Sequence, residues 1–455
     1  MPPNLVIEHV TAVTMNGSRE IIHDATIKIN GERITAVSPG DQLLEDTEAA
    51  VYIDGTGKVA LPGLINCHTH IAMSLQKGVT LMIPDGIYRV MWPVEKNLIP
   101  DDVYIGSLAG GAEALLAGAT TVVDHYFHAD QVARATTELG LRGVLGHTIM
   151  TQKGPFLGEI ELEKGIDFVK ERQGKDSLVI PWLAPHAPDT VSKDWLLKLR
   201  QTATDLNTGL HLHLAQSRQE QSYIEKTFGM SCTAYLADLE FLGPDVLAAH
   251  CIFIEDSDID LLADSGAHAI YCPMGHSLHG KPARAWEMLQ RGVSVVLATD
   301  CVTSNNVMDL TGELRIAGAA QKQLTGDSRA MPSSKILEMV TVDAANAIGM
   351  GDQLGRLGAG YLADLILLDF DGLSTAPNYS LLDNIVYCCN GRDVHTVVVN
   401  GEVVVQDHAL VRMDEKTLAQ EIESRGRTLI SKAVEGDVEL SRLMREGYQF
   451  EATES

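Results

Sequence analysis

The chain has 455 residues, of which 45% are hydrophobic and 21% are charged, so it has enough apolar material for a large globular core. It carries 35 basic and 61 acidic residues, and the resulting formal net charge of −26 disfavours nucleic acid and anionic membranes as partners. No basic segment followed by an apolar one opens the sequence, and no uncharged apolar run approaches the roughly 18 residues that span a bilayer. The seven cysteines are scattered and odd in number, which favours reduced thiols and a cytoplasmic location.

The two ends of the sequence share a β-hairpin pattern. Asn30-Gly31 and Asn400-Gly401 each separate two runs rich in valine, isoleucine and threonine. Asn-Gly is the strongest short hairpin signal, because both central residues of the turn adopt positive φ. We therefore expect one small β-sandwich domain assembled from residues 1–57 and 355–411.

Between these ends, eight short β-branched runs alternate with helical stretches over residues 58–354. This alternation predicts parallel strands joined by right-handed crossovers, and eight repeats close into a TIM-like (β/α)8 barrel. An open doubly wound sheet is the alternative, but the first run is not followed by a G-x-G-x-x-G phosphate loop. The charged segment 412–455 is expected to be a helical tail packed on the domain or on a neighbour. The predicted barrel strands are 58–66, 119–128, 142–150, 177–185, 209–216, 245–252, 268–273 and 293–300.

Histidine pairs occur where two of these predicted strands end. His68 and His70 close the first strand, and His211 and His213 close the fifth. Residues i and i+2 of a strand lie on the same face, so both members of a pair can point into the mouth of the barrel. Neutral imidazole is a good ligand for zinc or iron. We expect His213, nearer the strand end, to reach a metal, whereas for His211 a packed or hydrogen-bonded role in the barrel is as strong an alternative.

Two further strand ends carry residues that suit the same site. His250 follows an apolar run in the sixth strand, where a lone histidine is more often structural, but the strand order places it toward the barrel mouth. Asp300 ends the eighth strand, and an unpartnered carboxylate buried there would cost several kcal/mol. A cation or a hydrogen-bonded histidine is therefore expected beside Asp300. Together these strand ends predict a mononuclear metal site for hydrolysis.

A set of short motifs spread over nearly the whole chain makes a family resemblance visible. The sequence resembles the amidohydrolase superfamily, in the branch of S-adenosylhomocysteine/methylthioadenosine deaminases and triazine hydrolases. In combination the motifs are highly specific for the superfamily and moderately specific for the branch, and they do not fix a substrate. They are Leu61-Pro62-Gly63 to His70, Pro185-His186-Ala187-Pro188, His213-Leu214-Ala215-Gln216, Ala249-His250-Cys251, Thr299-Asp300 with Ser304-Asn305-Asn306, and Gly355 to Asp364.

The resemblance implies one divalent metal ion per subunit, with zinc preferred and iron or manganese as alternatives. It implies four ligands: His68, His70, His213 and Asp300. His250 is expected to hold or polarise the attacking water, Asp300 to accept its proton, and His186 to touch the substrate. Such a site would attack an electron-poor ring carbon that bears an amino group and release ammonia.

Some positions depart from the branch. Its deaminases carry a glutamate that shuttles a proton to the ring nitrogen where this chain has Gln216, and an amide cannot deliver a proton at pH 7. We expect Gln216 to hydrogen-bond the substrate and His125, at the end of the second strand, to shape the pocket. Asp85, upstream of Pro93-Val94-Glu95, takes the place of a glutamate that binds ribose hydroxyls, and its shorter side chain weakens the nucleoside prediction.

A third departure follows Cys272-Pro273, where Met274-Gly275-His276-Ser277 replaces the Ser-Asn of the branch. By strand order, His276 and His279 lie in a loop near the barrel mouth, where either could contact substrate.

The leading prediction is a hydrolytic deaminase of an amino-substituted nitrogen heterocycle that is adenosine-, guanine-, pterin- or triazine-like. The alternative is hydrolysis of another C–N or C–Cl bond, as in an s-triazine, an amide or a carbamate. Ligand binding without turnover is a third possibility, against which the retention of every expected ligand argues. The predicted partner is a small heterocyclic molecule, with no nucleic acid and no membrane, and the resemblance implies a homodimer or homotetramer.

Overall fold

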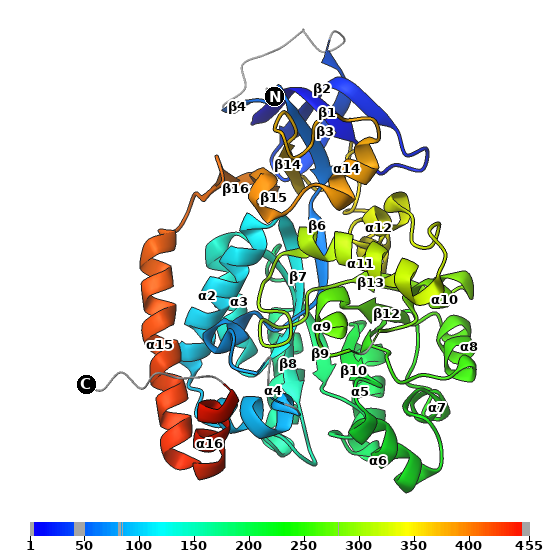
Figure 1. Ribbon diagram of the computed structural model, residues 1–455, viewed down its shortest axis with the longest axis vertical. Helices are drawn as coiled ribbons and strands as arrows, with labels where there is room; N and C mark the ends of the chain where they lie inside the picture. The colour runs from blue at the N-terminus through cyan, green and yellow to red at the C-terminus, as the bar shows by residue number, and fades with distance from the viewer. Residues whose placement is uncertain (1–3, 41–50, 81–82, 84, 281, 448–455) are drawn as a thin grey trace.

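The computed structural model describes residues 4–40, 51–80, 83, 85–280 and 282–447. Parts of the predicted N-terminal domain (1–3 and 41–50), Pro84 beside Asp85, and residues 448–455 of the predicted tail lie outside the described residues. Two sheets organise the chain: an eight-stranded barrel wrapped in helices and, above it in Figure 1, a nine-stranded sheet built from both ends of the sequence. The predicted fold class is confirmed.

The barrel strands are parallel and lie in chain order. The ring is closed where Thr69 bridges residue 300, and the N–H of Asp300 donates to the carbonyl of His68 at 3.0 Å. All eight residues of the second and of the third strand are buried, as expected for strands covered on both faces. The barrel strands are β6 (Leu64–Thr69), β7 (Ala119–Tyr126), β8 (Arg142–Ile149), β9 (Val179–Pro185), β10 (Leu210–Leu214), β11 (Val246–His250), β12 (His268–Tyr271) and β13 (Ser294–Leu297).

The first predicted strand, 58–66, is wrong as a single element, because the chain divides it between the two sheets. β5 (Lys58–Pro62) pairs within the nine-stranded sheet, and β6 begins the barrel after Gly63. A Cβ on Gly63 would lie 2.1 Å from the hydroxyl oxygen of Thr120, so only glycine allows the chain to pass so close to β7.

The nine-stranded sheet combines strands from before and after the barrel. Its order is β17-β16-β15-β14-β5-β1-β2-β3, with β4 paired to β1. The strands other than β5 are β1 (Leu5–Val13), β2 (Ile21–Asn30), β3 (Arg33–Pro39), β4 (Val51–Asp54), β14 (Leu365–Asp369), β15 (Val394–Val399), β16 (Glu402–Gln406) and β17 (Ala409–Leu410).

Both predicted hairpins form, but only one has the predicted turn. Asn400 and Gly401 have φ values of 52° and 80° and connect β15 to β16 as expected. In the first hairpin Asn30 still pairs with Arg33, so the turn residues are Gly31 and Glu32, and of these only Gly31 has positive φ. Asn30 therefore ends the strand instead of entering the turn.

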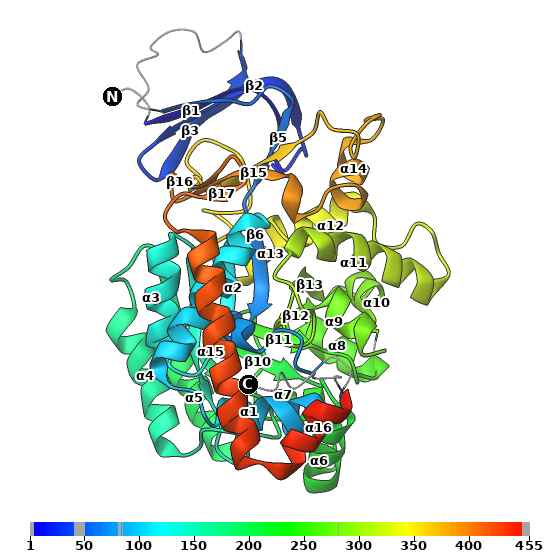
Figure 2. The same cartoon turned by 60° about the vertical axis from the view of Figure 1, so that its left-hand side comes forward.

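Helices cover the outside of the barrel (Figures 1 and 2). The longer ones are α2 (Pro100–Leu116), α3 (Ala129–Leu139), α4 (Glu159–Arg172), α5 (Lys193–Leu206), α6 (Arg218–Phe228), α8 (Asp256–Ser265) and α11 (Leu310–Thr325). Shorter segments are η2 (Ile71–Gln76), η3 (Ile87–Met91), α1 (Trp92–Glu95), α7 (Cys232–Asp238), α9 (Pro273–Leu278), α10 (Ala285–Gln290), α12 (Ser333–Met339), α13 (Val342–Ala347), α14 (Leu381–Tyr387) and η4 (Gly391–Asp393).

The last part of the chain is helical, as its composition predicts. α15 (Glu415–Gly436) lies along α2 and turns into α16 (Val438–Gly447), as Figure 2 shows. Arg425 of α15 pairs with Asp102 of α2 at 3.2 Å. Among the described residues, no helix combines the length and the apolar character that a membrane crossing requires.

Candidate active site

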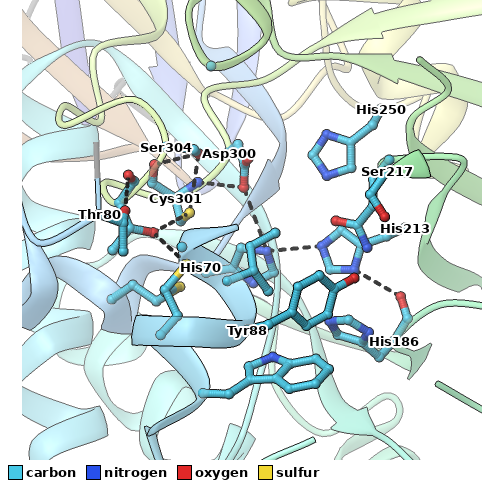
Figure 3. A pocket seen from close by; sticks show the side chains of 18 of the residues that line it. His70, Thr80, Tyr88, His186, His213, Ser217, His250, Asp300, Cys301 and Ser304 are labelled. Atoms are coloured by element: carbon cyan, nitrogen blue, oxygen red, sulfur yellow. Dashed lines mark hydrogen bonds and ion pairs between the residues drawn. The ribbon is translucent and has the colours of Figure 1, made fainter. Parts of the chain in front are cut away.

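The carboxyl ends of three barrel strands and the segment after the last one bring histidines and an aspartate together (Figure 3). Nε2 of His70 lies 3.3 Å from Nε2 of His213. Oδ1 of Asp300 lies 3.5 Å from Nε2 of His68 and 3.7 Å from Nε2 of His70. Ligand atoms bound to a tetrahedral zinc at 2.0–2.1 Å are about 3.3 Å apart, so these separations suit a shared cation.

Hydrogen bonds on the far side of two of these rings fix where their protons lie. Nδ1 of His70 is 2.8 Å from the carbonyl oxygen of His125, and Nδ1 of His213 is 2.9 Å from that of His186. A carbonyl only accepts, so each Nδ1 must carry hydrogen, and the neutral ring then has a lone pair at Nε2. Burial lowers the pKa of His213 well below its usual value, which keeps that ring neutral. Two lone pairs that face each other at 3.3 Å repel unless a cation lies between them.

His68 is held by a third histidine. Its Nδ1 lies 2.8 Å from Nε2 of His211, while its own Nε2 is buried without a hydrogen-bond partner. Burial lowers the pKa of both rings, and when Nδ1 of His68 donates to His211, its Nε2 has a lone pair for a ligand role on the side that faces Asp300. His211 thus has the hydrogen-bonded role in the barrel that the sequence left open.

Asp300 is held as an anion by its surroundings. Its Oδ1 accepts from the N–H of Cys301 at 2.6 Å, and its Oδ2 accepts from the hydroxyl of Ser304 at 2.8 Å. Burial opposes its ionisation, but the adjacent imidazole of His68, together with those of His250 and His70, holds the pKa of the carboxyl well below its usual range. Ser304 belongs to one of the family motifs, but the sequence did not predict this contact with Asp300.

His250 completes this end of the site. It has φ of 82°, and its ring stacks on that of His213 with centroids 5.3 Å apart. One of its nitrogens, together with one from His68 and an oxygen of Asp300, lies within 4.8 Å of the others. Its Nδ1 contacts Nε2 of His276 at 3.2 Å.

Comparison with known proteins identifies the family. Residues 59–404 match the amidohydrolase family. The chain belongs to the amidohydrolase family. A 5-methylthioadenosine/S-adenosylhomocysteine deaminase of Pelotomaculum thermopropionicum is 34% identical to it over 434 residues, which cover 94% of this chain and 99% of the relative.

Two solved structures share its fold. A zinc-bound adenosine deaminase from Xanthomonas campestris has a TM-score of 0.89 at 28% identity and covers 94% of this chain and 99% of its own. The zinc complex of the atrazine chlorohydrolase from Arthrobacter aurescens TC1 has a TM-score of 0.85 at 24% identity. The match covers 93% of this chain and 100% of the chlorohydrolase chain. The resemblance to the branch of these deaminases and triazine hydrolases is confirmed.

In this amidohydrolase His70, His213 and Asp300 line a cavity of about 410 Å³, a size that suits a small organic ligand. Trp92, Phe127 and Met150 supply apolar walls, and the rings of Trp92 and His186 have centroids 6.3 Å apart. Burial lowers the pKa of His186 to about 3, so it faces the cavity as a neutral ring, with Nδ1 at 3.0 Å from Thr190 Oγ1.

The remaining predicted substrate residues occupy different parts of the cavity. Gln216 lines it, and its backbone N–H donates to Glu220 at 2.8 Å. Asp85 is exposed at the rim, with φ of 55°, and accepts a hydrogen bond from Gln219 at 2.8 Å. His279 also lines the cavity, as does His276, which contacts His250.

His125 lies closer to the metal cluster than the sequence indicated. Its ring centroid is 4.7 Å from those of His70 and His213, and one of its nitrogens falls within 4.8 Å of theirs. Its Nε2 is buried without a hydrogen-bond partner. The position of His125 at a strand end indicated that it lies near the site, but the sequence alone could not show how close to the other histidines its ring lies.

Glu95 is a buried residue of the cavity, and the sequence analysis gave it no role of its own. It accepts a hydrogen bond from the hydroxyl of Tyr126 at 2.7 Å. Burial raises the pKa of Glu95 to about 7, so the cavity contains a carboxyl group that can gain or lose a proton near neutral pH.

Proposed function

We propose that this amidohydrolase is a zinc-dependent deaminase that removes an exocyclic amino group from a nitrogen heterocycle, with adenine nucleosides as the leading substrate class. The observation that carries this proposal is the convergence of His68, His70, His213 and Asp300 on one point beside a cavity. The Nε2 atoms of His70 and His213 face each other at 3.3 Å, a spacing at which both would be ligands of one zinc ion. The names of the deaminase relatives support the nucleoside class.

The chain's own residues supply distinct functions in this proposal. Zinc bound there would lower the pKa of water toward about 7 and act as a Lewis acid. Asp300, ionised and within 3.7 Å of two ligand nitrogens, is positioned to accept a proton from the attacking water. His250, held by His276, is positioned to orient that water. The neutral ring of His186 offers a hydrogen bond or a stacking surface to the substrate.

Gln216 favours a second candidate function. It lines the cavity but can only donate or accept hydrogen bonds, so it cannot protonate a ring nitrogen or a leaving amine. Hydrolysis of a C–Cl bond on an s-triazine would need no such proton, because chloride leaves as an anion. Hydrolysis of another C–N bond, in an amide or a carbamate, belongs to the same candidate class.

The deciding experiment incubates zinc-loaded protein with adenosine, methylthioadenosine, S-adenosylhomocysteine, guanine, pterin and chloro-, amino- and alkylamino-s-triazines. Release of ammonia from an adenine nucleoside is expected, and His70→Ala should abolish both that release and zinc binding. Release of chloride or an alkylamine without ammonia would favour the second candidate. Tight binding of a heterocycle without turnover would favour a protein that binds its ligand without catalysis.

We also infer a cytoplasmic location. All seven cysteines are free thiols, and six of them are buried, which fits a reducing compartment. Assembly into a homodimer or homotetramer stays a prediction, which light scattering on the purified protein would test.

A further inference from the structure

A second group of metal-ligand side chains lies in the nine-stranded sheet, above the barrel in Figure 2. Asp369 ends β14, His395 is the second residue of β15, and His408 lies in the turn between β16 and β17. Antiparallel pairing places these three positions at one end of the sheet, because Leu368 pairs with Val394 and the N–H of His408 donates to the carbonyl of His395. Residues far apart in sequence are thereby brought side by side.

The ligand atoms of this cluster are spaced as metal ligands are. One nitrogen from each imidazole and one oxygen of Asp369 lie within 4.8 Å of one another. Nε2 of His408 is 3.0 Å from Oδ2 of Asp369, and Nε2 of His395 is 3.1 Å from Oδ1 of Asp407. Ligands of a four-coordinate zinc are about 3.3 Å apart, and two imidazoles with carboxylates suit zinc, copper or nickel.

Each of these side chains is oriented by a hydrogen bond at its other polar atom. Nδ1 of His408 lies 3.0 Å from the carbonyl oxygen of Val394, so this nitrogen donates to the carbonyl and Nε2 faces Asp369. Lys58 donates to Oδ1 of Asp369 at 2.7 Å and leaves Oδ2 facing His408. Supporting contacts of this kind are what hold ligands in known metal sites.

The third ligand is held through its other ring nitrogen. Nδ1 of His395 lies 2.8 Å from the hydroxyl of the buried Thr396.

The turn that carries His408 is unusual. Asp407 and His408 have φ values of 52° and 64°, the same left-handed conformation that Asn400 and Gly401 adopt in the neighbouring turn. Glycine takes this conformation freely, whereas a histidine there is strained. The turn geometry therefore does not itself require a histidine at this position.

We propose that Asp369, His395 and His408 bind a second divalent transition-metal ion. The site differs from the one in the barrel and joins β14, β15 and the β16–β17 turn. It does not depend on which reaction the barrel catalyses.

The test uses the full-length protein, stripped with a chelator, dialysed against zinc and analysed for bound metal. The wild-type chain should bind two equivalents, whereas His408→Gly and His395→Ala should each bind one. Glycine at 408 suits the left-handed turn, so loss of metal there would reflect the missing ligand. His23→Ala removes an exposed histidine of β2 in the same sheet and should leave two equivalents.

Substitutions in both sites separate this proposal from the catalytic one. His70→Ala should remove the barrel equivalent, and the double variant His70→Ala/His408→Gly should bind none. The His408→Gly chain should keep its hydrolytic activity. The second site would be overturned if the wild-type protein bound only one equivalent of zinc and His70→Ala eliminated it. It would also be overturned if His408→Gly and His395→Ala both still bound two equivalents.

Discussion

His70 and His213 can act as metal ligands because backbone carbonyls determine their tautomers. Each ring donates through Nδ1, at 2.8 Å and 2.9 Å, and directs Nε2 into the barrel. His68 reaches the same arrangement differently, because its Nδ1 is held by the side chain of His211. A side chain is easier to alter than a carbonyl, which makes His211 the point at which the support of a ligand can be tested.

Replacing His211 with leucine should weaken zinc binding by about 10–100-fold, the usual effect of losing a residue that supports a ligand. The variant loses the partner of His68 Nδ1, so the ring is free to rotate away from Asp300. Competition with a chromogenic chelator measures the affinity. His211→Asn, which keeps a hydrogen-bonding group, should retain more affinity, and equal affinities for leucine and wild type would show that barrel packing alone orients His68.

Gln216→Glu should raise the rate of ammonia release, because it restores a group that can donate a proton inside the cavity. Acid–base assistance accelerates such reactions by about 10²–10⁴-fold, so we expect kcat to rise by about 10²-fold. Steady-state assays against the best substrate measure kcat, with Gln216→Leu as the control that removes hydrogen bonding altogether. An unchanged or lower kcat would mean that another cavity group, such as Glu95 with its pKa of about 7, already supplies the proton.

At the scale of elements, one buried ion pair connects the two sheets. Arg142, at the start of β8, donates to both carboxylate oxygens of Asp364 at 2.9 Å and 3.0 Å, and the two side chains are 1% and 2% exposed. The N–H of Asn400 also donates to this carboxylate at 2.8 Å. The pair therefore joins a barrel strand to the segment before β14 and to the β15–β16 turn.

Asp364→Asn should lower the free energy of unfolding by about 3–5 kcal/mol, because it leaves the guanidinium of Arg142 buried without its counter-charge. Urea denaturation followed by circular dichroism measures the change. Asp327→Asn breaks the exposed pair with Arg329 and should leave stability unchanged. If both variants unfolded at the same urea concentration as the wild type, Arg142 would not be what holds the sheets together.

The elements also show which features sequence patterns can predict. Period and alternation located seven of the eight barrel strands and overlapped the first only at its start. Strand-end position placed His68, His70, His213, His250 and Asp300 at one end of the barrel, because parallel strands share an end. The division of the first predicted strand at Gly63 was not predicted, because it depends on the approach of Thr120 from another strand. Side-chain contacts across the barrel could not be predicted either, because they also depend on how separate strands approach one another.

At the scale of the whole molecule, the C-terminal helix supports the segment that follows the metal ligands. α15 lies against α2, as Figure 2 shows, and it also contacts η2, which begins directly after His70. A Cβ on Gly426 would lie 2.8 Å from the backbone oxygen of Leu75 in η2, so glycine is what permits this close packing. Displacement of α15 would therefore be transmitted to a segment whose first residue adjoins a ligand.

Gly426→Ala should lower the free energy of unfolding by about 1–3 kcal/mol, because neither backbone can yield without separating the helix from η2. It should also weaken zinc binding, since η2 follows His70 without a linker. Gly436→Ala is the matched control, because a Cβ at that position of the same helix meets nothing within 4 Å. Thermal unfolding with and without zinc measures both effects. If Gly426→Ala lowered stability but not zinc affinity, α15 would support the barrel wall without positioning the ligands, whereas a loss of both would extend the catalytic support to the last helices of the chain.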